Sequence, residues 1–299
     1  MRLLVTGSHG LIGRRLCRAL EFAGFEIRRF DIRRSFIEDI RNSEALFDAL
    51  QNVAGVIHLA AVSRVSVAEQ DPSHCASVNE SALAQMLALM PRCHTPPWLV
   101  FTSSKEVYGF QSQPPVNEDV VRRPINTYGL SKLKGEALIL SARHTLPAAN
   151  IVRLSNVYGD IEDHPERVVP NFARAAARGG TITICGADSR LDFVHVDDAV
   201  RGILSLIDLT RQCVTVEPIH LASGVGTTLN ELAHLTVLHA RQPVETVFTA
   251  ANPHQIPEFI GDVGRAARIL LWRCAIDIET GFRQLVQDFD ARTIEDNRP

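Results

Sequence analysis

The segment Met1-Arg-Leu-Leu-Val-Thr-Gly-Ser-His-Gly-Leu-Ile-Gly13 predicts most of the architecture. A short apolar run, residues 3–5, precedes Gly7, Gly10 and Gly13, and a stretch with helical periodicity follows directly. One glycine permits a sharp turn, a second lets the backbone approach phosphate groups, and a third lets the helix pack close to the strand. Because a helix N-terminus presents free N–H groups to an anion, this strand, turn and helix are expected to bind the pyrophosphate of a dinucleotide.

An acidic residue at the end of the next apolar segment indicates which dinucleotide is bound. Asp31 closes residues 25–31, and a carboxylate at this point accepts hydrogen bonds from the adenosine ribose hydroxyls and repels a 2′-phosphate. A solvated aspartate at a strand end is the simpler alternative. Arg33 and Arg34 follow closely and could instead pair with the 2′-phosphate of NADP. The sequence favours NAD and does not exclude NADP.

Strand-like and helix-like segments alternate as far as about residue 160. The expected strands are 3–5, 26–30, 55–59, 98–102 and 150–154, and the expected helices are 11–22, 43–50, 79–90 and 131–144. This alternation is typical of an α/β fold with a doubly wound parallel Rossmann sheet, which binds ligands at the carboxyl ends of its strands. We expect residues 1–163, with return segments at about 191–224, to form this domain. Residues 164–190 and 225–299 are expected to form a smaller, mixed substrate-binding lobe.

Composition and charge exclude several classes of function. The chain has 299 residues, of which 45% are hydrophobic and 22% charged, as in an ordinary globular protein. A net charge of −3 gives no electrostatic case for binding nucleic acid or a membrane, and neither a membrane span nor a signal peptide is expected. Six cysteines without C-x-x-C spacing indicate reduced thiols in a cytoplasmic protein, with no metal site.

Three polar residues are candidates for chemistry. Tyr128 and Lys132 lie one helical turn apart at the start of a helix, so that both side chains face the same way. A nearby ammonium group lowers the pKa of a tyrosine and makes it a better base. Ser104 follows the fourth expected strand, at the sheet edge that faces a ligand, and could share a proton with Tyr128. Ser103 is the adjacent alternative.

A family resemblance rests on motifs that occur in order along nearly the whole chain. They are TGSHGLIG (6–13), Asp31, HLAA (58–61), SVNES (77–81), SSKEVYG (103–109), RRPINTYGLSK (122–132), VRLSNVYGD (152–160), DFVHVDD (192–198) and IGDVGRAARILLW (260–272). The chain resembles the extended short-chain dehydrogenases/reductases of the NAD-dependent sugar epimerase/dehydratase family.

The resemblance implies roles for individual residues. Asp39 and Ile40 would flank adenine, Lys132 would bind the nicotinamide ribose, and Asn79 would support the active-site helix. The implied cofactor groove comprises Gly7, Gly10, Leu11, Ile12, Gly13, Asp31, Asp39, Ile40, Leu59, Ala60, Ala61, Asn79, Tyr128 and Lys132. The implied substrate contacts are Ser63, Ser104, Asn156 and Arg190, and the implied catalytic residues are Ser104, Tyr128, Lys132 and Glu106.

The implied chemistry is oxidation of a carbinol held between Ser104 and Tyr128, with Tyr128 accepting its proton as hydride passes to the nicotinamide. In epimerases the ketone then turns over and receives the hydride on its other face, so NAD is not consumed. Related dehydratases carry Asp-Glu after the hydroxyl residue, whereas this chain has Lys105-Glu106. The lysine weakens the dehydratase hypothesis, and a structural role for Glu106 has about equal weight.

Two departures from the family pattern concern the substrate. Nucleotide-sugar members usually carry arginines where this chain has Leu191 and Asn252. Such arginines neutralise the substrate diphosphate through charge-assisted hydrogen bonds. Four other arginines could replace them, namely Arg64, Arg167, Arg174 and Arg190. Otherwise, the substrate carries no nucleotide diphosphate.

Several functions therefore remain in competition. The leading hypothesis is an NAD-dependent nucleotide-sugar epimerase, and the main alternative is a net dehydrogenase or reductase of a non-nucleotide sugar, lactone or cyclitol. A dehydratase or decarboxylase that uses Glu106 and a non-catalytic dinucleotide-binding regulator are less favoured. A homodimer is expected from apolar faces on helices 79–90 and 131–144, given by Leu83, Met86, Leu87, Met90, Leu133, Ala137, Leu138 and Leu140. These faces could instead pack within one subunit.

Overall fold

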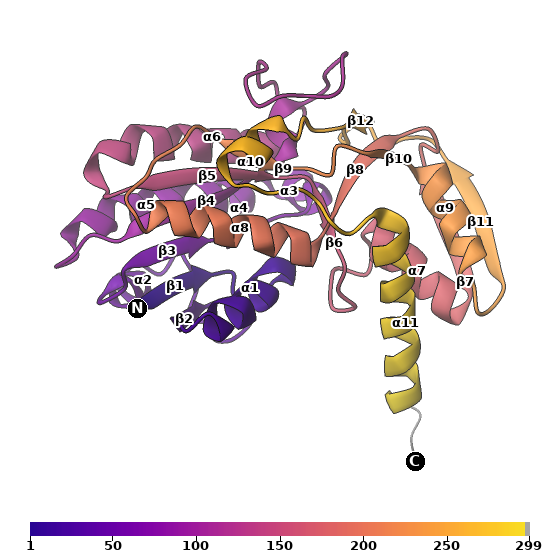
Figure 1. The fold of residues 1–299 in the computed structure, drawn as a ribbon, viewed down its shortest axis with the longest axis horizontal. Helices are drawn as coiled ribbons and strands as arrows, with labels where there is room; N and C mark the ends of the chain where they lie inside the picture. The colour runs from indigo at the N-terminus through magenta and orange to yellow at the C-terminus, as the bar shows by residue number, and fades with distance from the viewer. Residues whose placement is uncertain (297–299) are drawn as a thin grey trace.

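A computed structural model describes residues 1–296 and shows a larger lobe built on a six-stranded sheet (Figure 1). All neighbouring strands in this sheet are parallel, in the order β2-β1-β3-β4-β5-β9. The strands are β1 (Arg2–Thr6), β2 (Glu26–Phe30), β3 (Gly55–His58), β4 (Trp98–Ser104), β5 (Ala149–Leu154) and β9 (Ile219–Leu221). Because the chain moves outward from β1 in both directions, the switch point lies between β1 and β3, where such sheets bind ligands.

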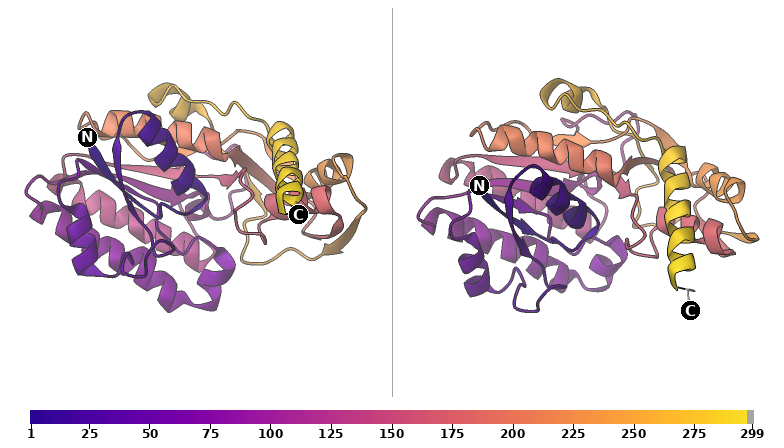
Figure 2. Two further views of the ribbon diagram at one scale, coloured as in Figure 1. Left: turned by 90° about the horizontal axis from the view of Figure 1, so that it is seen from below. Right: turned by 60° about the horizontal axis from the view of Figure 1, so that its bottom comes forward.

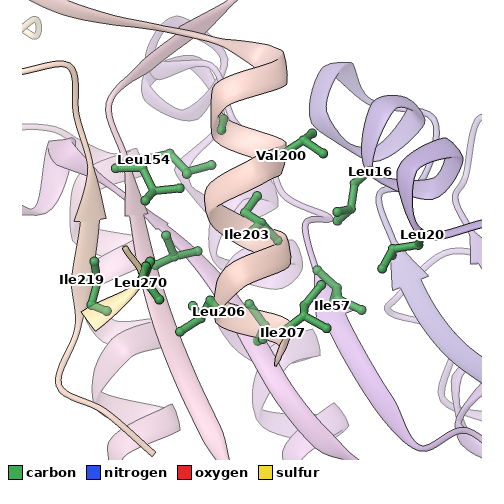
Figure 3. Packing of buried hydrophobic residues seen from close by; sticks show 14 of the residues in the cluster. Leu16, Leu20, Ile57, Leu154, Val200, Ile203, Leu206, Ile207, Ile219 and Leu270 are labelled. Carbon is green, nitrogen blue, oxygen red and sulfur yellow. The ribbon is translucent and has the colours of Figure 1, made fainter. Parts of the chain in front are cut away.

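Helices cover both faces of the sheet (Figure 2). On one face lie α1 (Leu11–Phe22) and α8 (Val196–Thr210), and on the other lie α2 (Ser43–Leu50), α5 (Ala82–Leu89) and α6 (Thr127–Ala142). Alternate residues of a strand point to opposite faces, so Leu3 and Val5 pack toward α1 and α8 while Leu4 packs toward α2 and α5. Figure 3 shows Val200 of α8 facing Leu16 of α1, with Ile203 and Leu206 farther along α8 over the sheet. The predicted doubly wound α/β fold is confirmed.

The second lobe contains three helices and a small two-stranded sheet. Its elements are α7 (Val168–Arg178), β7 (Gly180–Cys185), α9 (Leu229–Leu238), β11 (Val244–Thr249) and α11 (Ile278–Asp296). Strands β7 and β11 are parallel, and α7 packs between α9 and α11 around Phe172 and Phe282. This lobe stands beside the carboxyl edge of the large sheet (Figure 1).

A further small sheet lies between the two lobes. Its strands are β6 (Asn156–Tyr158), β8 (Arg190–His195), β10 (Gly226–Thr228) and β12 (Glu258–Phe259). The remaining α-helices are α3 (Val65–Gln70), α4 (Pro72–Ala76) and α10 (Gly264–Ile269), and short 3-10 or π segments occupy 77–81, 90–92, 105–108 and 143–145. Within residues 1–296, no helix has the length and apolar character needed to span a bilayer.

Two expected helices have different boundaries in the structure. Helix α6 begins at Thr127 rather than at residue 131, because the Asn126 side chain accepts a hydrogen bond from the Gly129 N–H and caps it. The expected helix 79–90 is divided into a π segment, α5 and a 3-10 turn. In α5 and at Met90, the apolar residues expected at a dimer face are buried in the subunit core, whereas Leu140 of α6 remains exposed.

Candidate active site

A cavity of about 720 Å³ extends from the carboxyl edge of the large sheet to the second lobe. The glycine turn and Asp31 line one part of it, and Ser104, Tyr128 and Lys132 line another. Residues of the second lobe, including Leu229, close the far side. Except for Asn79, the predicted cofactor and catalytic residues therefore line one cavity, although they come from distant segments of the chain.

The glycine turn has room for the phosphate groups of a ligand but not for side chains at Gly7 and Gly13. Gly7 has a φ of +69°, and a Cβ on it would lie 2.7 Å from the backbone nitrogen of Ala60. A Cβ on Gly13 would lie 2.2 Å from the Gly7 carbonyl oxygen. Helix α1 begins at Leu11 with Gly10 as its N-cap and without a side-chain cap. This close approach of strand and helix, with an open helix N-terminus, fits a dinucleotide pyrophosphate.

Asp31 presents a buried carboxylate at the end of β2. One of its oxygens accepts a hydrogen bond from the His9 N–H at 2.8 Å, and the other accepts one from the Arg33 N–H at 2.8 Å. Of the two arginines that could recognise a 2′-phosphate, Arg33 lines the cavity and Arg34 does not. Arg33 donates to the His9 carbonyl at 3.2 Å, and Arg34 pairs with Glu38. The arrangement suits a ribose diol beside Asp31.

The expected adenine and groove residues also line the cavity. They are Leu11, Ile12, Asp39, Ile40, Leu59, Ala60 and Ala61, and the expected substrate contact Ser63 lines the cavity as well. Arg41 binds Asp39 and holds the pKa of that carboxyl below its usual range. Asn79 differs from these residues because its buried side chain bonds to the Val62 backbone and to the Ser131 hydroxyl. It connects the groove loop to α6, which agrees with the supporting role implied by the resemblance.

Ser104 ends β4, and Tyr128 and Lys132 lie in the first turns of α6. The Lys132 ammonium donates to the Thr102 carbonyl at 2.8 Å and lies 4.9 Å from the centre of the Phe101 ring. Burial lowers the pKa of Lys132 to about 8. Burial raises the pKa of Tyr128 to about 12, and the Ser104 hydroxyl and the Arg167 charge offset only part of that shift. The predicted lowering of the Tyr128 pKa is therefore wrong for the protein alone, because desolvation of the phenolate outweighs nearby positive charge.

Ser103 and Ser104 both line the cavity, but their side chains have different environments. The Ser103 hydroxyl donates to Glu136 at 2.6 Å, and both oxygens of Glu136 also accept bonds from Arg153 at 2.8 Å. The Ser104 hydroxyl accepts only a long bond, 3.2 Å, from the Glu106 N–H, besides its interaction with Tyr128. Ser104 is the hydroxyl available to a ligand.

Glu106 is held at both of its oxygens. The buried Lys105 ammonium lies 2.8 Å from one oxygen, and Asn126 donates to the other at 2.8 Å. The same Asn126 side chain caps α6 and also donates to the His254 carbonyl at 3.0 Å. These contacts give Glu106 a clear structural purpose, because through Asn126 it orients the helix that carries Tyr128.

The structure separates the expected substrate residues. Asn156 lines the cavity and donates to the Asp192 carbonyl at 2.9 Å, and Leu191 and Asn252 also line the cavity. Arg190 lies outside it, with its guanidinium 4.0 Å from Glu258. Side chains alternate along β8, so the face that brings Leu191 into the cavity directs Arg190 away from it.

Two supporting residues, Asn126 and Glu136, are absent from the sequence-based expectations. Each carries a recognisable signal, since asparagine is a favoured N-cap and Glu136 lies one turn beyond Lys132 on α6. Among residues 1–296, no group of three or more histidine, cysteine, aspartate or glutamate side chains is arranged to hold a metal ion.

Comparisons with known proteins agree with this geometry. The chain is 25% identical over 302 residues to a putative UDP-glucose 4-epimerase of Methanocaldococcus jannaschii, covering 95% of this chain and 97% of the relative. It is 24% identical over 325 residues to UDP-glucuronate 4-epimerase 1 of Arabidopsis thaliana, covering 95% and 76% of the two chains. The solved structure of MoeE5 with UDP-glucose and NAD superposes with a TM-score of 0.88 at 24% identity, covering 98% of this chain and 100% of that one.

A fourth comparison identifies the family. The family model described as "NAD dependent epimerase/dehydratase family" matches residues 3–221, which include the glycine turn, Asp31, Ser104, Tyr128 and Lys132. The match covers the large sheet from the second residue of β1 to the end of β9. The chain therefore belongs to the NAD dependent epimerase/dehydratase family.

Proposed function

We propose that this protein is an NAD-dependent enzyme that oxidises a secondary alcohol of a sugar, as a nucleotide-sugar epimerase. The observation that carries the proposal is the single cavity lined by the glycine turn, Asp31 and the Ser104, Tyr128 and Lys132 group. The relatives described above are named as a putative UDP-glucose 4-epimerase and a UDP-glucuronate 4-epimerase. Because the family is NAD-dependent and Asp31 faces the cavity, NAD is the proposed cofactor.

The side chains of the site account for the proton transfer. Ser104 positions the substrate hydroxyl, and Tyr128 accepts its proton. When bound, oxidised NAD supplies the hydride acceptor and a positive charge. Since burial raises the pKa of Tyr128 to about 12, a positive charge in the cavity is needed to make the phenol an effective base near neutral pH. Lys132, fixed on the Thr102 carbonyl, holds its ammonium in the same region.

A net dehydrogenase or reductase of a non-nucleotide sugar is the second candidate, favoured by Leu191 and Asn252 in the cavity wall. A dehydrogenase would accumulate NADH and a reductase would consume it, whereas an epimerase would do neither. The dehydratase hypothesis is weaker because both oxygens of Glu106 are already engaged. A non-catalytic regulator would have no use for Tyr128.

The test is turnover of UDP-glucose and UDP-glucuronate followed by NMR, together with NADH absorbance. We expect inversion at one sugar carbon without net NADH, and loss of turnover in Tyr128→Phe with NAD affinity retained. Tyr108→Phe is a matched control, because Tyr108 does not line the cavity and its hydroxyl bonds to the His220 ring at 2.9 Å. Full turnover by Tyr128→Phe would contradict the mechanism. NADH formation from a free sugar, lactone or cyclitol, with neither UDP-sugar turned over, would favour the second candidate.

We also propose that the protein is a homodimer in the cytoplasm. Leu130 and Leu140 of α6 are 45% and 38% exposed, and exposed apolar side chains on one helix can form a two-fold contact. Light scattering coupled to gel filtration measures the assembly, and Leu140→Glu is expected to give monomers. A monomeric wild-type protein would contradict this part of the proposal.

A further inference from the structure

The second-lobe wall of the cavity offers little charge to a substrate. It includes Leu191 and Asn252 at the positions discussed above, with Thr183, Ser189 and Gln255 nearby, and all five are uncharged. A diphosphate needs charge-assisted hydrogen bonds to repay the loss of its hydration. If the substrate is a nucleotide sugar, as proposed above, positive charge must come from another wall.

Arg64 and Arg167 are the candidates elsewhere in the cavity lining. Arg64 precedes α3 and Arg167 precedes α7, and their side chains are 38% and 33% exposed and line the cavity. The other cationic side chains among the described lining residues have different positions. Lys105 and Lys132 are buried on Glu106 and Thr102, and Arg33 and Arg41 lie with Asp31 and Asp39 at the adenosine end.

The remaining arginines do not compete for this role. Arg174 bonds to Asn171, one turn earlier on α7, at 3.2 Å, and it does not line the cavity. Arg190 also lies outside, beside Glu258. Of the four arginines that could replace the missing pair, the structure therefore brings two to the cavity.

Both guanidinium groups retain hydrogen-bonding capacity. Arg167 lies 3.4 Å from Asp163 and 3.5 Å from the Ser63 hydroxyl, which are long contacts. Arg64 pairs through one terminal nitrogen with Glu166. Because a guanidinium carries five N–H donors, each arginine can keep its carboxylate partner and still donate to a phosphate. The acids hold the arginines in place and also compete with an incoming anion.

Electrostatic effects on neighbouring groups show that the two charges act on the same region. Burial lowers the pKa of His164, and the charges of Arg167 and Arg64 lower it further. The charge of Arg167 also opposes the rise in the pKa of Tyr128. Helix α7 begins at Val168 without a side-chain cap, so its N-terminal dipole adds positive potential there.

We propose that Arg64 and Arg167 bind the diphosphate of the nucleotide-sugar substrate and replace the arginines missing at Leu191 and Asn252. The diphosphate is then held from the side of α3 and the α7 N-terminus, with the sugar between it and Tyr128. Glu166 acts as a competing anion that a substrate must displace in part.

The experiment is calorimetric titration of UDP and of uridine into NAD-saturated protein. One charge-assisted hydrogen bond contributes enough to change a Kd by about 10–100-fold. Arg64→Ala and Arg167→Ala should each weaken UDP binding by about that factor and leave uridine binding unchanged. Glu166→Gln should tighten UDP binding by a few-fold. Arg211→Ala, which removes a surface partner of Asp208, is the matched control and should change nothing.

The outcomes separate this inference from the proposed function. Unchanged UDP affinity in both arginine variants, or loss of affinity only in Arg190→Ala, would overturn the inference and leave the nucleotide-sugar function intact. Weaker NAD binding in the variants would assign the arginines to the cofactor and also overturn it. If the wild-type protein binds none of UDP, TDP, GDP and CDP, the nucleotide-sugar function itself is wrong. Circular dichroism melts of every variant confirm that each is folded.

Discussion

Replacing Gly13 by alanine tests whether the glycine turn binds the dinucleotide pyrophosphate. A Cβ at this position would lie 2.2 Å from the Gly7 carbonyl oxygen and 2.8 Å from the Ser8 Cα. Ordinary contact begins at 3.4 Å, so the turn and α1 must separate by roughly 1 Å. That displacement moves the backbone N–H groups at the start of α1 away from the position of the pyrophosphate.

The expected magnitudes follow from these contacts. Overpacking costs about 1–3 kcal/mol of unfolding free energy, and each kcal/mol lowers Tm by about 2–4 °C in a protein of this size. Misplacing one backbone hydrogen bond to a charged phosphate costs about 1.5–3 kcal/mol, which raises the Kd for NAD about 10–100-fold. Differential scanning calorimetry measures the first effect, and isothermal titration with NAD measures the second.

Gly24→Ala is the matched control for Gly13→Ala. Gly24 has a φ of +83°, and a Cβ there meets nothing within 4 Å, so alanine introduces backbone strain without a clash. We expect it to cost about 1–2 kcal/mol of stability with no change in NAD affinity. If Gly13→Ala binds NAD as tightly as the wild type while melting at a lower temperature, the glycine turn does not bind the pyrophosphate.

Three other perturbations test the site and its surroundings. Asp31→Ser removes the carboxylate that faces the cavity, so the Kd for NAD should rise about tenfold. The variant should also bind NADP more tightly than the wild type does. Unchanged NADP affinity, measured by calorimetry, would refute the role of Asp31 at the adenosine ribose. Glu106→Gln leaves the buried Lys105 ammonium without its counter-charge. The unfolding free energy should therefore fall by about 3–5 kcal/mol in urea titrations. The double variant that also carries Lys105→Met should lose less stability than Glu106→Gln alone. Burial lowers the pKa of His58 to about 3, below its unfolded value of about 6.5. The unfolded state therefore binds more protons between these values, stability should fall as pH drops from 6.5 toward 3, and His58→Asn should flatten that part of the stability profile.

Short-range patterns explain why much of the site could be predicted from sequence. The turn at Gly7 and Gly13 and the four-residue spacing of Tyr128 and Lys132 on α6 are local features, which backbone geometry alone determines. The alternation of strands and helices then places Asp31 and Ser104 at the same sheet edge.

Burial and long-range contacts explain what the sequence did not reveal. The pKa of Tyr128 depends on how much solvent the second lobe excludes, which no local pattern states. The pairing of Arg64 with Glu166 joins two loops that meet only in the folded protein. The sequence also does not reveal which of the neighbouring residues Arg190 and Leu191 faces the cavity. A shift of one residue along β8 would exchange the two side chains.

The three hydrogen bonds of the Asn126 side chain connect the loop at His254 with Glu106 and the start of α6. One amide caps α6, holds Glu106 and reaches the His254 carbonyl in the loop that also contains Asn252. Engineering that loop to accept a different sugar will therefore also move the residue that orients Tyr128. Grafted loops should retain an acceptor for Asn126 at position 254, or a change of substrate preference will come with a loss of catalytic rate.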